Sequence, residues 1–482
     1  MEFSSIAFIW MFLPVTLCFY YLLAFLPLSV IRLALQNVIL LLASLVFYCF
    51  GGISNLFLML GLLLVNYNGS MALQKLAFKK EKASQRKFIF IFNIIVDVLI
   101  LAFYKYFEGL LNLITAISLW NNPLSEIGKT VFPRFIMPLA LSFVIFQLIS
   151  YLSDVYNRKI AAETSFVNFA LYVTFFAQLV QGPIMRFSVL GGQIRNREHS
   201  IVRIASGIRR FVLGFAKKAI LANRFAALAN SIWQMDALQI NCGEAWLGLI
   251  AYTLQIYFDF SAYSDMAIGV GRMFGFEITE NFNNPYFAIS IRDFWKRWHM
   301  SLSNWFKDYI YIPLGGSRLG LKRTCENLFI VFLITGIWHG SDSTFVLWGI
   351  LFAIVSMLEH AFLGKLLDKN KYKIINWFYT IFVVIMGWVL FRAPDLNYAL
   401  NYYSALFNYS EAEDSVLGYL TPGSLSAFIF VFVLAISAKY LKIKEMSFKL
   451  KIAENILIIA LFIISIMITV SESYQPSIYW AF

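Results

Sequence analysis

Two histidines, His299 and His339, lie where polar and apolar side chains are most densely mixed, between residues 281 and 340. The pKa of histidine lies closest to neutrality, so a neutral imidazole can accept a proton from a hydroxyl group and return it. The sequence contains no HxxxH or HExxH motif, no GxSxG elbow and no glycine-rich phosphate loop. The residues therefore favour proton transfer by histidine and predict no metal site. The alternative is that the two rings serve only packing or the membrane interface.

The residues around His299 have the spacing of an amphipathic helix. One face carries the apolar side chains of Ile291, Phe294, Trp295, Trp298, Leu302, Trp305, Phe306 and Tyr309. The opposite face carries the charged side chains of Arg292, Asp293, Lys296, Arg297, Lys307 and Asp308. Such a segment does not cross a bilayer, so we expect it at the interface or entering the bundle from the cytosolic side. His299 falls at the edge of the apolar face, with Trp295 and Ser303 one turn away.

His339 is expected deep in the membrane. A proline and two glycines at 313–316 break the preceding helix, and the chain enters the membrane near Asn327. His339 follows 12 residues later, which places it about 18 Å into a hydrocarbon core of about 30 Å. Gly336 and Gly340 flank it and are expected to leave room beside the ring. A histidine at that depth must be hydrogen-bonded or line a wet cavity.

The elements that position these residues are expected to be membrane helices. Of the 482 residues, 60% are hydrophobic and 14% are charged, whereas soluble domains have about 45–50% apolar and about 25% charged residues. The apolar runs are continuous, which predicts an all-α polytopic membrane protein rather than a barrel. We expect about 11 transmembrane helices, together with re-entrant and interfacial amphipathic helices. They would form one domain over residues 1–482.

The net charge of +12 would suggest nucleic acid if the protein were soluble. In a membrane protein, lysine and arginine gather in cytosolic loops beside anionic headgroups, so we expect the membrane and no nucleic acid as a partner. The four cysteines lack CxxC spacing and predict neither a metal site nor a disulfide framework; they are Cys18, Cys49, Cys242 and Cys325. Residues 1–27 lack the marks of a cleavable signal, so we expect a retained first span.

The lengths of the apolar runs predict the spans. They cover residues 5–27, 34–50, 53–72, 88–107, 135–155, 243–260, a segment starting near 327, 343–363, 374–394, 422–440 and 453–470. The positive-inside rule places the basic loop from Lys75 to Lys87 in the cytosol. Residues 108–134 are expected to form an extracytoplasmic loop with a short interfacial helix. Residues 205–228 are expected to lie along the cytosolic interface as a basic amphipathic helix.

Residues 165–181 are predicted to dip into the membrane and return. If they crossed fully, the strongly basic segment after them would be extracytoplasmic, against the positive-inside rule. We expect an irregular tip at Gln178, Gln181, Gly182 and Pro183. Such backbone is tolerated only where protein or water covers it.

Several polar residues stand inside apolar runs. Asp97 is either functional or paired with a lysine or arginine of a neighbouring helix. A stripe at helical spacing is expected to face protein or a cavity; it consists of Ser142, Gln147, Ser150 and Asp154. Asp259 and Asp265, with glycines at 269, 271 and 275, indicate either a cavity-lining segment or a tight helix interface with two paired acids. The pattern leaves both interpretations open.

Taken together, these motifs resemble the membrane-bound O-acyltransferase family, in its bacterial branch of alginate and peptidoglycan O-acetyltransferases. The resemblance covers nearly the whole chain and begins with MEFSSIAFIWMFLPV. It continues in order through MPLALSFVIFQLISYLSDVY, FFAQLVQGPIMR, YFDFSAYSDMAIGVGRMFGF, NFNNPYFAISIRDFWKRWHMSLSNWFKDYIYIPLGGSR, GIWHG and WVLFRA. Some of these motifs are weak alone, but their order and spacing are specific.

The resemblance implies a ring of helices around a funnel or tunnel. His339 looks like the near-invariant family histidine at the tunnel floor, and His299 matches the second histidine, nearer the cytosolic mouth. The implied donor is cytosolic acetyl-CoA. The acetyl group would cross the bacterial inner membrane to a hydroxyl acceptor, directly or through a periplasmic partner acetyltransferase. We expect the two rings to lie beyond hydrogen-bond distance, with His339 as the base and His299 guiding donor or product.

Substrate-binding residues are expected close to the two histidines. They are Asn281, Asn284, Arg292, Lys296, Arg297, Trp298 and Trp338. The asparagine amides or the indole of Trp298 would stabilise the oxyanion that develops during acyl transfer. The basic residues would hold the phosphates of the donor, although solvated or headgroup-facing charge is the alternative interpretation.

The acceptor is expected to be a cell-wall glycan. Lysine exceeds arginine, and phenylalanine, isoleucine and asparagine are frequent, which hints at an A+T-rich genome and favours peptidoglycan over alginate. The alternatives are O-acetylation of alginate or another exopolysaccharide, and D-alanyl transfer to teichoic acid. A non-enzymatic alternative is a glycolipid transporter, although no internal repeat is visible in the sequence.

Overall fold

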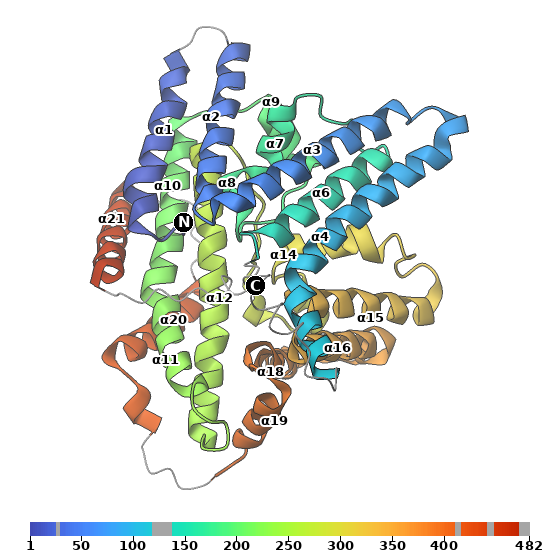
Figure 1. Cartoon of the computed structure of the whole chain (residues 1–482). Coiled ribbons are helices and arrows are strands. Elements are labelled where there is room, and N and C mark those ends of the chain that lie inside the picture. The colour runs from blue at the N-terminus through green and yellow to red at the C-terminus, as the bar shows by residue number, and fades with distance from the viewer. Residues whose placement is uncertain (26–28, 118–136, 410–415, 441–447, 472–482) are drawn as a thin grey trace.

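The computed structural model describes residues 1–25, 29–117, 137–409, 416–440 and 448–471. Within these ranges the regular structure is entirely helical (Figure 1). Seven described segments are long and apolar enough to cross a membrane: Phe8–Phe25, Ser29–Cys49, Ile53–Lys75, Lys80–Phe107, Ser343–Lys369, Lys373–Arg392 and Ile452–Ser471. Each coincides with a predicted span, so the prediction of an all-α polytopic membrane protein is confirmed.

The main helices of these segments are α1 (Leu13–Leu22), α2 (Ser29–Cys49), α3 (Ile53–Lys75), α4 (Ala83–Ile117), α16 (Ser343–Leu358), α18 (Lys373–Arg392) and α21 (Phe448–Ser471). The other predicted spans are also helices: α6 (Leu141–Tyr156), α12 (Cys242–Met273), α15 (Gly320–His339) and α20 (Pro422–Tyr440). The predicted loop at 108–134 begins too early, because α4 continues to Ile117. Residues 118–134 lie outside the described residues.

The prediction of an interfacial helix at residues 205–228 is wrong. The chain there forms α10 (Ile201–Ala216), a π-helical turn (Lys217–Ala222) and α11 (Asn223–Trp233). Together these elements are about 50 Å long, and they run beside α12 through the middle of the molecule (Figure 1). A helix with this much buried surface belongs to the bundle and not to the membrane surface.

Glycines and ion pairs explain why this basic helix enters the bundle. A Cβ atom on Gly207 would lie 2.6 Å from the carbonyl oxygen of Gly269, so the two backbones touch. Lys218 Nζ lies 2.6 Å from Asp259 Oδ1. Asp265 binds both Lys217, at 2.5 Å, and Arg210, at 2.6 Å. Both interpretations of residues 257–276 are supported, because the two acids are paired at a tight helix interface and Asp265 also lines a polar cavity. The ion pairs let basic side chains be buried.

The predicted re-entrant segment consists of short elements. Helix α7 (Phe166–Thr174) has 9 residues and α8 (Phe176–Leu179) has 4. Irregular backbone follows at 180–186, and Gln178 and Gln181 are buried. A helix of the length of α7 reaches about 14 Å, less than half of a bilayer core. These lengths agree with a segment that dips and returns; its sidedness stays a prediction.

The polar positions inside the helices are buried among protein atoms. The stripe on α6 is between 1% and 5% exposed, which confirms that it faces protein; it contains Ser142, Gln147, Ser150 and Asp154. Asp154 accepts a hydrogen bond from the hydroxyl of Tyr309 (2.8 Å), so α6 is bonded to the segment that follows His299. Asp97 accepts a hydrogen bond from Asn66 Nδ2 (2.9 Å), so the partner seen here is an amide and not the lysine or arginine of the pairing alternative.

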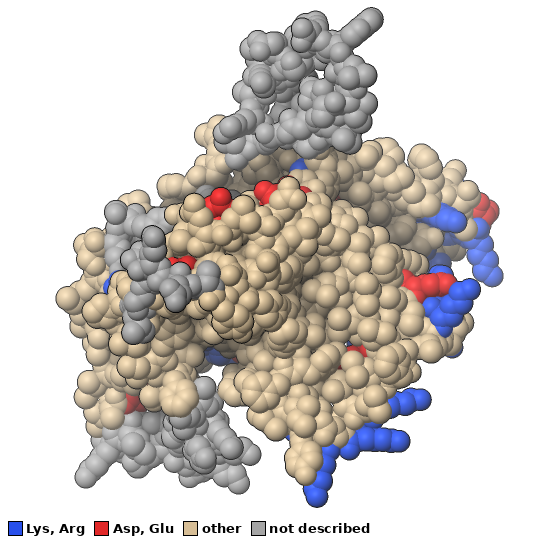
Figure 2. Space-filling model, turned by 90° about the horizontal axis from the view of Figure 1, so that it is seen from below, with Lys and Arg blue, Asp and Glu red and all other residues tan. Residues whose placement is uncertain are grey.

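Charge is unevenly placed on the surface. In the view from below, basic side chains gather along one edge, whereas most of the face is neutral (Figure 2). Large exposed apolar side chains cover the outer faces of the helices, for example Phe57 at 73% and Phe432 at 66%. Such a belt is expected of a surface that meets lipid tails.

Candidate active site

The stretch around His299 is not the single amphipathic helix that the spacing predicts. It consists of α13 (Ile291–Trp295), α14 (Met300–Phe306) and a π-helical turn (Lys307–Tyr311). The helix breaks at His299, which has a left-handed backbone with φ of 42°. Trp295 is therefore on a separate helix, whereas Ser303 keeps the expected spacing, because its backbone N–H donates to the carbonyl of His299 (3.0 Å).

The break has a physical cause in the preceding segment. The backbone N–H of Asn283 donates to the carbonyl of Arg297 (2.9 Å), and the N–H of Met300 donates to the carbonyl of Asn281 (2.9 Å). These bonds use backbone groups that a continuous helix would need. Residues 281–283 thus act as a clamp that turns the chain at His299. The clamp also buries His299, which is 3% exposed and not at the interface as expected.

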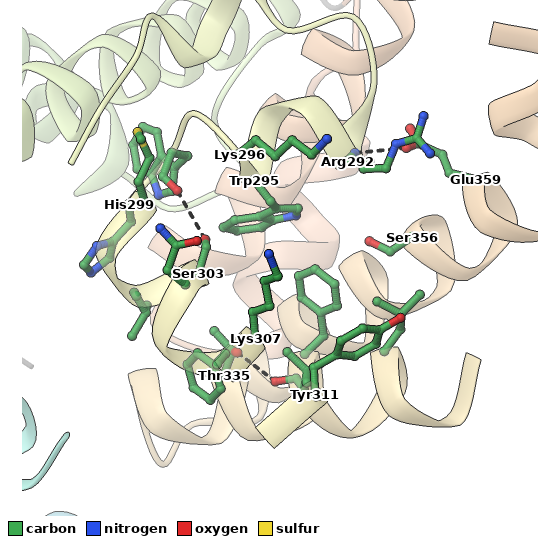
Figure 3. A pocket seen from close by; sticks show the side chains of 18 of the residues that line it. Arg292, Trp295, Lys296, His299, Ser303, Lys307, Tyr311, Thr335, Ser356 and Glu359 are labelled. Carbon is green, nitrogen blue, oxygen red and sulfur yellow. Dashed lines mark hydrogen bonds between the residues drawn. The ribbon is translucent and has the colours of Figure 1, made fainter. Parts of the chain in front are cut away.

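Both histidines line one cavity, the main cavity, with a volume of about 530 Å³. Its walls come from α13, α14, α15, α16 and α18. In the close view, His299 lies at one end, while the ammonium groups of Lys296 and Lys307 point into the space beside Trp295 (Figure 3). The elements that were predicted to carry the two histidines separately therefore bring them to the same chamber.

Asn281 orients His299. The Nδ1 atom of His299 lies 3.1 Å from Asn281 Oδ1, which also accepts from the backbone N–H (3.2 Å) and hydroxyl (2.9 Å) of Ser301. The amide nitrogen of Asn281 donates to Ser264 Oγ (3.2 Å), which fixes the orientation of the amide. Because a carbonyl oxygen only accepts, Nδ1 carries the proton and Nε2 has a free lone pair. Burial lowers the pKa of His299 to about 3, so the ring is neutral at neutral pH.

His339 ends α15 among aromatic rings. It is 7% exposed, and its ring makes edge contacts with Trp348, at 5.2 Å between centroids, and Phe391, at 5.0 Å. His299 also lines the main cavity, and the expectation that the two imidazoles lie beyond hydrogen-bond distance of each other stays a prediction.

The glycines beside His339 do not leave room, contrary to expectation. A Cβ atom on Gly336 would lie 2.5 Å from the carbonyl oxygen of Phe345, and one on Gly340 would overlap the Phe345 ring. The glycines instead let α15 approach α16 closely. This approach places Trp348 of α16 against His339.

Trp298, Arg292 and Lys296 line the main cavity as predicted, but Trp338 and Arg297 do not. The Trp338 ring stacks on Phe146, at 5.1 Å between centroids, and meets the His339 ring edge-on, at 4.7 Å. Arg297 bonds to Asp293 through Nε (2.9 Å), because the turn after α13 brings the two together.

Asn281 and Asn284 line a separate polar side cavity of about 480 Å³, not the main cavity. Asn281 lies between the two cavities and acts on His299. Asn284 has a left-handed backbone, with φ of 46°, and lines the side cavity but not the main cavity.

Within the described chain, no group of three or more His, Cys, Asp or Glu side chains is placed to hold a metal ion.

Lys307 lines the main cavity, although the sequence did not predict it as a site residue. The pattern that could have indicated it is its spacing of four residues from Ser303, which also lines the cavity. On the predicted helix Lys307 fell on the charged, solvent-facing side, which hid this relationship.

The fold and the site define an integral membrane protein with a buried chamber that presents two imidazoles. The family model for the membrane-bound O-acyltransferase family, MBOAT, matches residues 39–405. The chain belongs to this family and is an acyltransferase.

Three relatives illustrate the range of the family. The chain is 38% identical over 419 residues to the protein named "Probable alginate O-acetylase AlgI" of Pseudomonas putida, covering 86% of this chain and 82% of the relative. It is 34% identical over 390 residues to the peptidoglycan O-acetyltransferase of Helicobacter pylori, covering 75% and 72%. It is 26% identical over 260 residues to the teichoic acid D-alanyltransferase of Bacillus subtilis, covering 52% and 65%.

Proposed function

We propose that the protein takes an acetyl group from cytosolic acetyl-CoA and transfers it across the bacterial cytoplasmic membrane for O-acetylation of an exported glycan. The observation that carries this proposal is the main cavity, which combines His339 and a neutral His299 with cationic side chains along its wall. Arg292, Lys296 and Lys307 are exposed and supply positive charge where the phosphates of the donor would lie.

His339 acts as the general base in this proposal. It takes the proton of the acceptor hydroxyl while the hydroxyl oxygen attacks the thioester carbonyl. The carbon–sulfur bond then breaks, and the departing thiolate takes the proton back from the imidazolium, so the ring returns to its neutral form. His299, whose Nε2 atom is buried and unpartnered, guides the donor or the thiol product.

The oxyanion is stabilised by indole N–H groups. The Nε1 atoms of Trp295, Trp348 and Trp388 are buried and have no hydrogen-bond partner among the described residues, and all three residues line the main cavity. Buried donors without a partner are costly in a folded protein. They become favourable when negative charge develops on the carbonyl oxygen during acyl transfer. These tryptophans replace the asparagines and Trp298 that the sequence favoured for this role.

The acceptor is proposed as a class, an exported glycan that includes peptidoglycan and alginate. The sequence composition favoured peptidoglycan, whereas the identity to alginate O-acetylases, at 38%, exceeds that to the peptidoglycan enzyme, at 34%. Because the acceptor lies outside the membrane, a periplasmic acetyltransferase partner would receive the group and modify the glycan. D-alanyl transfer is the second candidate, supported only by 26% identity over about half of the chain.

The test uses the purified full-length chain in lipid nanodiscs with acetyl-labelled acetyl-CoA and separated acceptors. Peptidoglycan fragments and alginate are supplied with and without periplasmic extract, and a D-alanyl-charged carrier protein is offered in a parallel assay. Label on a glycan hydroxyl that mild base releases supports the proposal. Transfer of D-alanine without acetyl transfer, or no hydrolysis or transfer of acetyl-CoA under any condition, would reject it.

A further inference from the structure

A third cavity lies away from His299 and His339, among the start of α2, the N-terminus of α7 and residues 194–199, with a volume of about 560 Å³. We call it the arginine cavity, because its lining contains Arg32, Arg195 and Arg197 and no acidic side chain. Arg195 is neutralised by Glu163, with 2.7 Å between Nη2 and Oε2. Arg32 and Arg197 have no ion-pair partner within the described chain. The cavity therefore carries uncompensated positive charge.

Arg197 is buried, but part of its guanidinium group has no hydrogen-bond acceptor in the described residues. It is 8% exposed, its Nε atom donates to the hydroxyl of Tyr20 (3.1 Å), and its guanidinium carbon lies 4.4 Å from the centre of the Phe276 ring. The Nη1 and Nη2 atoms are buried, and no hydrogen-bond partner for them is found in the described residues. A guanidinium is a planar fork of five N–H donors that matches the oxygens of a phosphate. A buried charge without such partners is unfavourable.

The pKa of the neighbouring His199 is also shifted by the positive charge of these arginines. The Nε2 atom of His199 lies 2.8 Å from the Tyr20 hydroxyl. Burial lowers the pKa of His199, and the charges of Arg197, Arg32 and Arg203 lower it further, to about 4. A neutral His199 adds no positive charge of its own, so the potential comes from the arginines.

The surroundings of the arginine cavity suit a lipid. Val30, Ile201 and Val202 beside it are 80%, 85% and 80% exposed, so apolar surface continues from the basic pocket. Figure 1 places the start of α2 and α9 (Phe187–Arg195) at the same end of the molecule. The basic loops predict that this end is cytosolic, where the leaflet is rich in anionic lipids.

We propose that the arginine cavity binds a phosphate group, with Arg32 and Arg197 as its ligands, and that an anionic phospholipid headgroup is its natural source. The lipid phosphate would complete the donor set of Arg197, while its acyl chains lie along the exposed apolar side chains. A bound headgroup would also hold α1 and α2 against the segment after α9.

The test uses the full-length protein in nanodiscs that contain equal amounts of phosphatidylcholine and phosphatidylglycerol. Lipids that stay bound after mild detergent extraction are counted by native mass spectrometry. A parallel arm measures the melting temperature in detergent with inorganic phosphate. The variants are Arg32→Gln and the double variant Arg32→Gln/Arg197→Gln. The matched control is Lys79→Gln, which removes an exposed charge of the basic loop outside the cavity.

We expect wild type and Lys79→Gln to retain phosphatidylglycerol in preference to phosphatidylcholine. Arg32→Gln should reduce the preference about tenfold, the loss expected for a charge-assisted hydrogen bond, and the double variant should abolish it. Because Arg197 contacts Tyr20 and Phe276, Arg197→Lys keeps the charge and checks that a loss of binding is not a loss of fold. Stabilisation by inorganic phosphate that depends on the same arginines would support the phosphate site and make a free phosphate its source. Equal retention of both lipids together with no response to phosphate, or binding unchanged in the double variant, would overturn the proposal.

Discussion

The Nδ1 atom of His299 lies 3.1 Å from the side-chain oxygen of Asn281, and the Nε2 atom of the same ring is buried without a partner in the described part of the chain. This contact sets the tautomer, because the amide oxygen takes the Nδ1 proton and leaves a lone pair on Nε2. The amide itself is fixed by Ser264 and Ser301. Asn281 is therefore a positioning residue for His299, and the polar side cavity lies behind it.

Asn281→Ala should weaken both activity and stability. It removes the acceptor for His299 and for the backbone N–H of Ser301, and an unsatisfied buried donor costs about 1–3 kcal/mol. We expect a lower melting temperature and a fall in acetyl transfer. Asn283→Ala is the control, because Asn283 is exposed and near the same side cavity. If the two variants had the same melting temperature and the same acetyl-transfer activity, Asn281 would not be a positioning residue.

Protonation of His299 should destabilise the folded protein at low pH. Its folded pKa of about 3 lies below the unfolded value of about 6.5. Between these values the unfolded chain binds more protons than the folded chain. The contribution of His299 to the free energy of unfolding is therefore fully present above the unfolded pKa and is lost as the pH falls toward the folded pKa. Melting temperatures in detergent from about pH 7 to about pH 5 should decline more steeply for wild type than for His299→Gln. Parallel declines would show that His299 is not the group responsible.

Trp348→Phe tests the indole donors. Most of the aromatic ring and its contact with His339 are kept, but the buried indole N–H is lost. Removal of one oxyanion donor typically lowers kcat about 10²–10³-fold. Trp338→Phe is the matched control: like Trp348, Trp338 contacts the His339 ring and has a buried Nε1 atom without a partner in the described residues, but it does not line the main cavity. If both variants kept full kcat, the oxyanion would need another donor.

Lys307→Gln should weaken donor binding. Lys307 is exposed and lines the main cavity, so it can reach a donor phosphate while it remains away from the reacting carbonyl. We expect KM for acetyl-CoA to rise about three- to tenfold with little change in kcat. Arg297→Gln should leave KM unchanged, since Arg297 is held by Asp293 outside the cavity. A rise in KM for Arg297→Gln alone would reverse the assignment.

The sequence predicted the helices where one physical rule dominated. Apolar runs of spanning length gave α2, α3 and α18 within a few residues, because length and hydropathy alone determine a span. The polar stripe on α6 was also predicted, since buried polar residues at helical spacing must face protein.

The predictions failed where segments distant in the sequence form ion pairs or backbone hydrogen bonds with the residues concerned. The basic residues of α10 and of the π-helical turn after it predicted an interfacial helix because their partners, Asp259 and Asp265, come some forty residues or more later in the sequence. The turn at His299 was invisible for the same reason, since the bonds that break the helix come from residues 281–283. Local periodicity cannot register such contacts.

The most direct test of the account is O-acetylation in cells that carry His339→Ala or His339→Gln. His339 lines the main cavity beside the unpartnered indole of Trp348, and the account assigns it the proton transfer. The variants should insert and accumulate like wild type, while O-acetyl groups released from the glycan by mild base fall by about 10²–10⁴-fold. Undiminished O-acetyl release from a variant that accumulates normally would contradict the claim that this cavity is the site of acyl transfer.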